Sequence, residues 1–246
     1  MIFNLEEIII VTILSIFQSI FGVGLLLFGT PIFLILGNDF FDSLNILIPV
    51  SIMISFLQIK SNQFSYKNDF IKRFNIITIP SLLFALYFVV TNYQNININL
   101  IISSIIIIFS LVNIFLSQKI LKKNNDKIID SFIFLLIGLV HGLTNLGGSL
   151  LTLASTKIND KKEIVRFCIA YGYLTMGIFQ LFVINFFTNV EFNLDKIYLM
   201  IIPFVIFKFS QIFFKHLSNL RYNLILNLIA LFFGIYIFFQ FLSSQS

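Results

Sequence analysis

The sequence predicts an all-α polytopic membrane protein made of two repeats of four hydrophobic segments each. Three observations predict this fold class. Hydrophobic residues make up 58% of the 246 residues and charged residues only 11%, whereas soluble domains carry about 25% charge. Uncharged runs long enough to cross a bilayer recur along the chain. A shift of 123 residues also superposes rare residues of the first half on rare residues of the second half.

The internal repeat rests on residue types that are uncommon in this chain. There are only four prolines and four methionines, so their coincidence after one shift is informative. The shift of 123 relates Gln18 to His141, Gly22 to Asn145, Gly24 to Gly147, Met53 to Met176, and Pro80 to Pro203. We therefore predict a duplication, with a first membrane repeat over 1–123 and a second over 124–246, which together form one integral membrane domain.

The first hydrophobic segment is predicted to be a broken helix. The chain carries no charge from Ile8 to Gly37, a run of thirty residues, whereas a straight membrane helix needs about 20. Glycine in a helix costs about 1 kcal/mol relative to alanine, so a break over Phe21–Gly24 is expected. The run then suits a re-entrant hairpin of two half-helices. The alternative is a continuous helix that packs closely on its neighbours through small residues.

The rest of the first half divides into spans and polar connections. Residues 43–59 form one predicted span, and the basic segment 60–73 follows it. Residues 74–118 are uncharged but too long for one helix. The Asn-rich stretch 91–99 resists burial in hydrocarbon and splits them into two spans. The charged stretch 119–130 is the predicted boundary between the halves.

The second half is predicted to repeat this plan. Residues 131–156 contain the second glycine-rich break, and 157–166 form a basic loop. Three further spans are expected over 167–190, 197–214 and 222–242.

The positions of the 16 Lys and Arg residues favour one of two topologies. If all eight segments cross the membrane, the cations divide nine to seven between the two sides, which is a poor positive-inside pattern. If the first segment of each half is re-entrant, loops 60–73, 118–130, 156–166 and 208–221 share one face and hold fifteen cations. This second arrangement predicts three crossings per half, inverted repeats, a cytoplasmic basic face and both termini outside. The alternative is that all eight segments cross the membrane and the chain does not follow the positive-inside rule.

The two predicted breaks are candidate anion sites. The second half-helix of each hairpin begins with backbone N–H groups that lack a helical partner and carry the positive end of the helix dipole. These donors are expected at about Val23–Leu26 and Leu146–Ser149. With inverted repeats they should meet near the midplane, where many secondary transporters bind substrate. The residues expected to bind substrate are Gln18, Phe21, Gly22, Gly24, His141, Thr144, Asn145, Gly147, Gly148 and Ser149.

His141 is the one titratable side chain within the predicted membrane segments, apart from Lys208 near a segment end. Ionisable groups inside a membrane usually serve function, and histidine titrates near neutral pH, so contact with substrate or coupling to protons is one interpretation. The alternative is a histidine that only bonds a hydroxyl or carbonyl of a neighbouring helix. Gln18, its equivalent in the first repeat, cannot carry a proton. Weaker candidates, whose side chains are more often simple interhelical hydrogen-bonding groups, are Gln180, Tyr171, Thr144, Ser51 and Ser55.

The two glycine-containing stretches also carry a family resemblance. Phe21–Pro31 (FGVGLLLFGTP) and His141–Gly148 (HGLTNLGG) resemble the two signature segments of the TauE/SafE sulfite-exporter family. The resemblance covers nearly the whole chain, although Gly24 is followed here by Leu25 instead of further glycine. It implies a multi-pass permease of the cell inner (plasma) membrane for small sulfur-containing or carboxylate anions, such as sulfite and organosulfonates. It also implies passive movement of the anion or coupling to an ion gradient.

Other functional classes fit the sequence less well. A membrane-embedded enzyme needs an acid/base pair, an activated nucleophile or a metal cluster, and His141 and His216 are far apart in the predicted plan, with no carboxylate in mid-span. We expect no enzyme activity, no metal and no cofactor. The expected partners are a small anion, the lipid bilayer and, as a candidate, protons or another coupling ion, but not nucleic acid. A structural or assembly protein of the membrane is the main alternative. The oligomeric state is open, and a homodimer is among the choices.

Overall fold

The computed structural model describes residues 5–62, 68–92, 127–158, 160–188, 194–226 and 228. The regular elements in these ranges are all helical, and none of them is a strand. Four of the helices are long and apolar enough to cross a membrane: Phe40–Ser61, Asp69–Asn92, Lys162–Phe187 and Lys196–His216. The predicted all-helical class is therefore confirmed, and its long apolar helices are those of a membrane protein.

The first half begins with the predicted break. Helix α1 ends at Phe21 and α2 starts at Leu25, so the chain leaves helical geometry across Gly22–Gly24. Asp39 begins the next helix as an N-cap, since its side chain accepts a hydrogen bond from Phe41 N at 3.1 Å. The elements of this half are α1 (Leu5–Phe21), α2 (Leu25–Ile35), α3 (Phe40–Ser61), α4 (Asn68–Arg73), a π-helical stretch (Phe74–Thr78) and α5 (Ile79–Asn92).

The second half follows the same order of elements. They are α7 (Lys127–Thr144), α8 (Gly148–Ile158), α9 (Lys162–Phe187), a 3₁₀ stretch (Leu194–Ile201) and α10 (Ile202–His216). Helix α9 starts inside the segment 157–166 that was expected to be a loop, so Lys162 and Arg166 are helical residues. The predicted span between the Asn-rich stretch and residue 118 lies outside the described residues, and so does most of the predicted span over 222–242.

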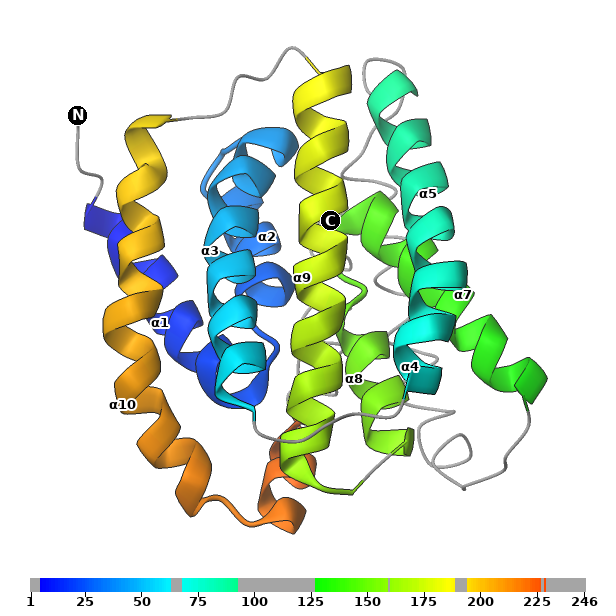
Figure 1. Ribbon diagram of the computed structural model, residues 1–246. Coiled ribbons are helices and arrows are strands. Elements are labelled where there is room, and N and C mark those ends of the chain that lie inside the picture. The colour runs from blue at the N-terminus through cyan, green and yellow to red at the C-terminus, as the bar shows by residue number, and fades with distance from the viewer. Residues whose placement is uncertain are drawn as a thin grey trace, which may run out of the picture.

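The two broken helices enter the molecule from opposite ends. In Figure 1, α1 runs inward from the upper side and α2 returns to that side, whereas α7 runs inward from the lower side and α8 returns there. Helices α3, α5, α9 and α10 run along the height of the molecule, with α3 and α9 in contact at its centre. Helix α10 packs on α1, and α5 packs on α7. Each half thus covers the hairpin of the other half.

Small residues allow close contact where α5 meets α7. A Cβ added to Gly142 would lie 2.6 Å from the backbone oxygen of Leu82, and one added to Gly138 would lie 2.0 Å from Ser81 Oγ. This is the backbone approach typical of helix pairs in membranes. In contrast, large apolar side chains of α10 point outward: Phe204, Phe209 and Phe213 are 55%, 64% and 66% exposed.

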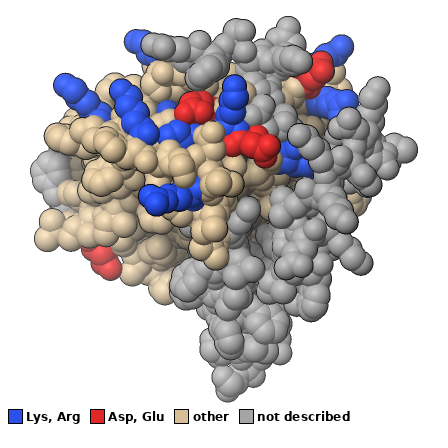
Figure 2. Space-filling model, turned by 90° about the horizontal axis from the view of Figure 1, so that it is seen from below, with Lys and Arg blue, Asp and Glu red and all other residues tan. Residues whose placement is uncertain are grey.

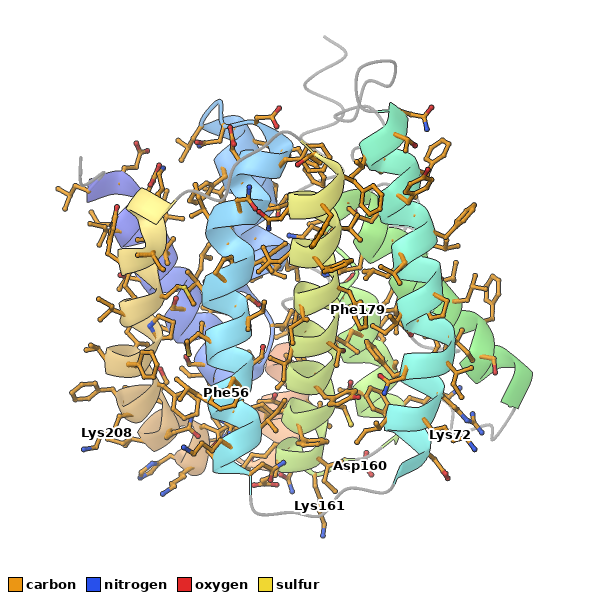
Figure 3. The ribbon with its side chains drawn as sticks, turned by 45° about the horizontal axis from the view of Figure 1, so that its top comes forward. Phe56, Lys72, Asp160, Lys161, Phe179 and Lys208 are labelled. Atoms are coloured by element: carbon orange, nitrogen blue, oxygen red, sulfur yellow. The ribbon has the colours of Figure 1, made fainter. Side chains whose placement is uncertain are left out.

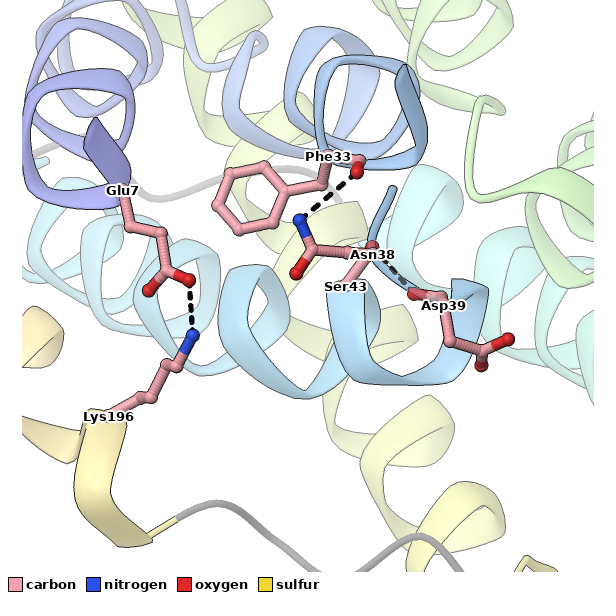
Figure 4. A network of polar contacts seen from close by, with 6 residues as sticks. All are labelled: Glu7, Phe33, Asn38, Asp39, Ser43 and Lys196. Carbon is pink, nitrogen blue, oxygen red and sulfur yellow. Dashed lines mark hydrogen bonds and ion pairs between the residues drawn. The ribbon is translucent and has the colours of Figure 1, made fainter. Parts of the chain in front are cut away.

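The charged side chains are distributed unequally between the two ends of the molecule. Helices α3, α8 and α10 end, and α4 and α9 begin, at the lower side, where most of the described Lys and Arg residues gather (Figure 2). Lys72, Lys161 and Lys208 lie along this edge in Figure 3. Of the described cations, Lys196 alone lies at the upper side, where it forms an ion pair with the buried Glu7 (Figure 4).

Candidate anion-binding site

The two helix breaks begin with the same backbone conformation. Gly22 has φ 83° and Asn145 has φ 64°, so both residues are left-handed, as is common just after the end of a helix. Gly22 N donates to Gln18 O at 2.7 Å, and Asn145 N donates to His141 O at 2.8 Å. These are pairs related by the shift of 123, so residues that this shift matches share one local backbone geometry.

The helices that follow the breaks also start alike. Phe28 N donates to Gly24 O at 2.8 Å, and Leu151 N donates to Gly147 O at 3.0 Å. Both helices therefore begin one residue after a glycine. Their first-turn N–H groups precede these bonds and have no carbonyl of their own helix to reach.

Gly24 and Gly147 let the two arms of each hairpin approach closely. A Cβ on Gly147 would lie 2.7 Å from His141 Cβ and 2.8 Å from Ile137 O. A Cβ on Gly24, where φ is 148°, would lie 3.2 Å from Phe17 Cβ. Both glycines are expected from the sequence to bind substrate, but in the structure the absence of their side chains serves the packing of α2 on α1 and of α8 on α7.

The start of α8 meets the first hairpin. A Cβ on Gly148 would lie 3.3 Å from Val23 Cγ2, and Asn145 Nδ2 donates to Thr30 Oγ1 at 2.8 Å. Helices α2 and α8 are in contact and point away from this place in opposite directions (Figure 1). Two helix N-termini, each equivalent to about half a positive charge, thus face the interior of the molecule.

The hydroxyl of Tyr173 covers the first residue of α8. A Cβ on Gly148 would lie only 1.7 Å from Tyr173 Oη. The Tyr173 side chain is completely buried, and its hydroxyl has no hydrogen-bond partner among the described residues. The ring lies edge-on to His141 with centroids 5.8 Å apart, and His141 Nδ1 is likewise buried without a partner. Two buried polar atoms without a described partner, Tyr173 Oη and His141 Nδ1, therefore lie beside the start of α8. Leaving such a group unsatisfied costs about 1–3 kcal/mol.

A chain of side-chain hydrogen bonds holds the second break in place. His141 Nε2 lies 3.1 Å from Gln180 Oε1, and Gln180 Nε2 donates to Asn145 Oδ1 at 3.2 Å. Since Asn145 also donates to Thr30, the chain connects α7, α9 and α2. Gln180, a weaker candidate in the sequence, is therefore part of the site.

Thr144 and Ser149 bond mainly to the local backbone. Thr144 Oγ1 donates to Val140 O at 2.7 Å and accepts from Leu146 N at 3.2 Å. Ser149 is partly buried, and its hydroxyl donates to Leu146 O at 3.5 Å. Both side chains shape the turn between α7 and α8.

Gln18 and Phe21 are already occupied by protein partners. Gln18 Nε2 donates to Ser51 Oγ at 2.8 Å and Ser55 Oγ at 3.3 Å, which fixes α1 on α3. Phe21 O accepts a hydrogen bond from Tyr222 Oη at 2.7 Å, and the two rings stack at 5.8 Å. The Gln18 amide and the Phe21 carbonyl at the first break therefore already have protein partners.

The structure adds two residues that the sequence did not single out, Arg166 and Tyr173. Both belong to the buried face of α9, where Arg166, Ile169, Tyr173, Met176 and Gln180 follow one another at spacings of three or four residues. That helical period was the available signal, but the expected loop over 157–166 concealed its beginning. Tyr171, a weaker candidate in the sequence, forms an exposed hydrogen bond with Asn75 at 2.9 Å and is not part of the site.

The described residues contain no group of three or more His, Cys, Asp or Glu side chains that could hold a metal ion. No family model, curated protein or solved structure matches this chain.

Proposed function

We propose that this protein is a membrane permease for small anions, bound near the midplane between the two helix breaks. The observation that carries the proposal is the meeting of two helix N-termini inside an apolar helical protein, beside the unpartnered hydroxyl of Tyr173. Backbone N–H groups at a helix start and a hydroxyl donor are groups that bind oxyanions. The resemblance to the TauE/SafE signature segments favours sulfite, organosulfonates or related carboxylates as substrates.

The charges of the groups around the site favour binding of an anion over binding of a cation. Glu7 is the buried carboxylate among the described residues, and it pairs with Lys196 at the upper end of the molecule. The polar side chains around the second break are amides, hydroxyls and an imidazole. A cation would meet the positive ends of two helix dipoles there without a carboxylate to offset them.

The proposed topology is a pair of inverted repeats with re-entrant hairpins. The opposite entry of the two hairpins in Figure 1 and the basic lower face in Figure 2 support it. By the positive-inside rule the lower face is cytoplasmic. The arrangement matches transporters in which broken helices of two repeats form a midplane site.

Thermal unfolding of the purified protein in detergent tests the proposal. Methanesulfonate, sulfite, acetate and sulfate are compared with chloride at equal ionic strength. A ligand that binds only the folded protein stabilises it by about 2.7 kcal/mol at a hundred times its Kd, so a substrate should raise the Tm in a saturable way. Liposomes containing the protein should then take up the same anion faster than empty liposomes. If no anion exceeds chloride and no uptake occurs, the protein is not an anion permease.

A further inference from the structure

Arg166 lies between the basic lower face and the first helix break. It belongs to the second turn of α9, and its side chain is only 6% exposed. A Cβ on Gly22 would lie 3.4 Å from Arg166 Cγ, so the stem of the arginine passes directly against the break. A guanidinium is charged at any physiological pH, which places a permanent positive charge beside the first break.

The protein itself satisfies this charge poorly. Arg166 donates one hydrogen bond, to Ser19 O at 3.4 Å, and its Cζ lies 3.4 Å from the centre of the Phe214 ring. Glu163, three residues earlier on α9, interacts with the guanidinium electrostatically, but the two do not form an ion pair in the described part of the chain. The Ser19 hydroxyl is also buried without a partner. A guanidinium has five N–H donors, and one of them makes this hydrogen bond to a described residue.

Lys162, one turn earlier on α9, shows what a satisfied buried cation looks like here. Its Nζ donates to Phe214 O at 2.8 Å, to Lys215 O at 3.2 Å and to Leu217 O. These carbonyls end α10, where a positive charge is favourable. Lys162 therefore has a structural role, whereas the described residues give the buried charge of Arg166 no comparable set of carbonyl acceptors.

We propose that Arg166 binds the transported anion through two of its oxygens on the cytoplasmic side of the first break. The inference rests on the proposed function and specifies its substrate class: an anion with at least two oxygens on one centre, such as a sulfonate, sulfite or carboxylate. The guanidinium fork matches two such oxygens, whereas a halide offers it no paired acceptors.

The test measures the Kd of methanesulfonate and of chloride by thermal unfolding for the wild-type chain, Arg166→Gln and Arg166→Lys. Arg221→Gln is the matched control, because Arg221 is an exposed arginine near the same face. We expect Arg166→Gln to raise the Kd of methanesulfonate about 10-fold to 100-fold. Arg166→Lys keeps the charge but not the fork, so it should lose preference for methanesulfonate over chloride. Arg221→Gln should leave both constants unchanged.

An Arg166→Gln protein that folds and binds methanesulfonate as the wild type does would overturn the inference while leaving the proposed function intact. If Arg166→Gln does not fold, Arg166→Lys decides: an unchanged preference for methanesulfonate over chloride overturns the inference, and a reduced preference supports it. If the wild-type protein responds to no anion, the proposed function fails and this inference fails with it.

Discussion

Replacing Tyr173 with phenylalanine should change stability and anion binding in opposite directions. The hydroxyl is completely buried and has no partner among the described residues. Leaving such a group unsatisfied costs about 1–3 kcal/mol, so its removal should stabilise the anion-free protein by up to that amount. For soluble domains of this size, 1 kcal/mol corresponds to about 2–4 °C in Tm. We therefore expect Tyr173→Phe to unfold several degrees higher than the wild type in chloride.

The same substitution should weaken anion binding. A hydrogen bond to a charged acceptor contributes about 1.5–3 kcal/mol, so loss of the Tyr173 donor should raise the Kd of a bound sulfonate about 10-fold to 100-fold. Thermal unfolding across a methanesulfonate series measures both effects in one experiment. The anion-free Tm should rise while the anion-induced increase in Tm becomes smaller. If Tyr173 only fills space, its replacement should not raise the anion-free Tm while reducing the anion-induced increase in Tm.

Tyr171→Phe is the matched control, since Tyr171 lies on the same helix but bonds Asn75 in an exposed position. It should change neither the Tm nor the anion response appreciably. If Tyr173→Phe keeps the full anion-induced shift, the hydroxyl does not contact substrate and the site is wrongly placed.

Two further predictions concern the break and the topology. Asn145 has φ 64°, so Asn145→Ala should destabilise the fold by about 1 kcal/mol more than Asn145→Gly, because alanine is strained in the left-handed region and glycine is not; equal Tm values for the two variants would contradict this account of the second break. The topology is tested with single cysteines in a Cys168→Ala background. Cysteines replacing Lys72, Lys161 and Lys208 should react with an impermeant thiol reagent from the cytoplasmic side, and one replacing the exposed Asp42 only from the other side. If the cysteines at positions 72 and 161 react from opposite sides, re-entrant hairpins are excluded.

The sequence alone was enough to locate the helix breaks. Gly22, Gly24 and Gly147 interrupt apolar runs, and glycine's backbone preferences act locally, so they can be read without tertiary structure. The shift of 123 also matched Gly22 with Asn145, and the structure gives both residues a left-handed φ. Asparagine is among the few residues that adopt this conformation readily, which accounts for the shared conformation of Gly22 and Asn145.

Composition likewise determined the helical class and the unequal distribution of charge. The apolar runs could only satisfy their backbone groups in a bilayer as helices or as a closed barrel, and their length selected helices. The basic segments at the ends of those runs indicated which ends lie together, because Lys and Arg avoid the hydrocarbon.

Only the tertiary structure decided which side chains meet at the breaks. Tyr173 reaches Gly148 from α9, and Arg166 reaches Ser19 across 147 positions of sequence. Such contacts depend on how α9 is rotated against both hairpins, and many rotations bury an equally apolar face. The structure also showed that Gln18 is hydrogen-bonded to Ser51, whereas the buried Tyr173 hydroxyl has no partner among the described residues. Whether a buried polar group has a partner is a property of its neighbours in space, so no reading of its own sequence position can supply it.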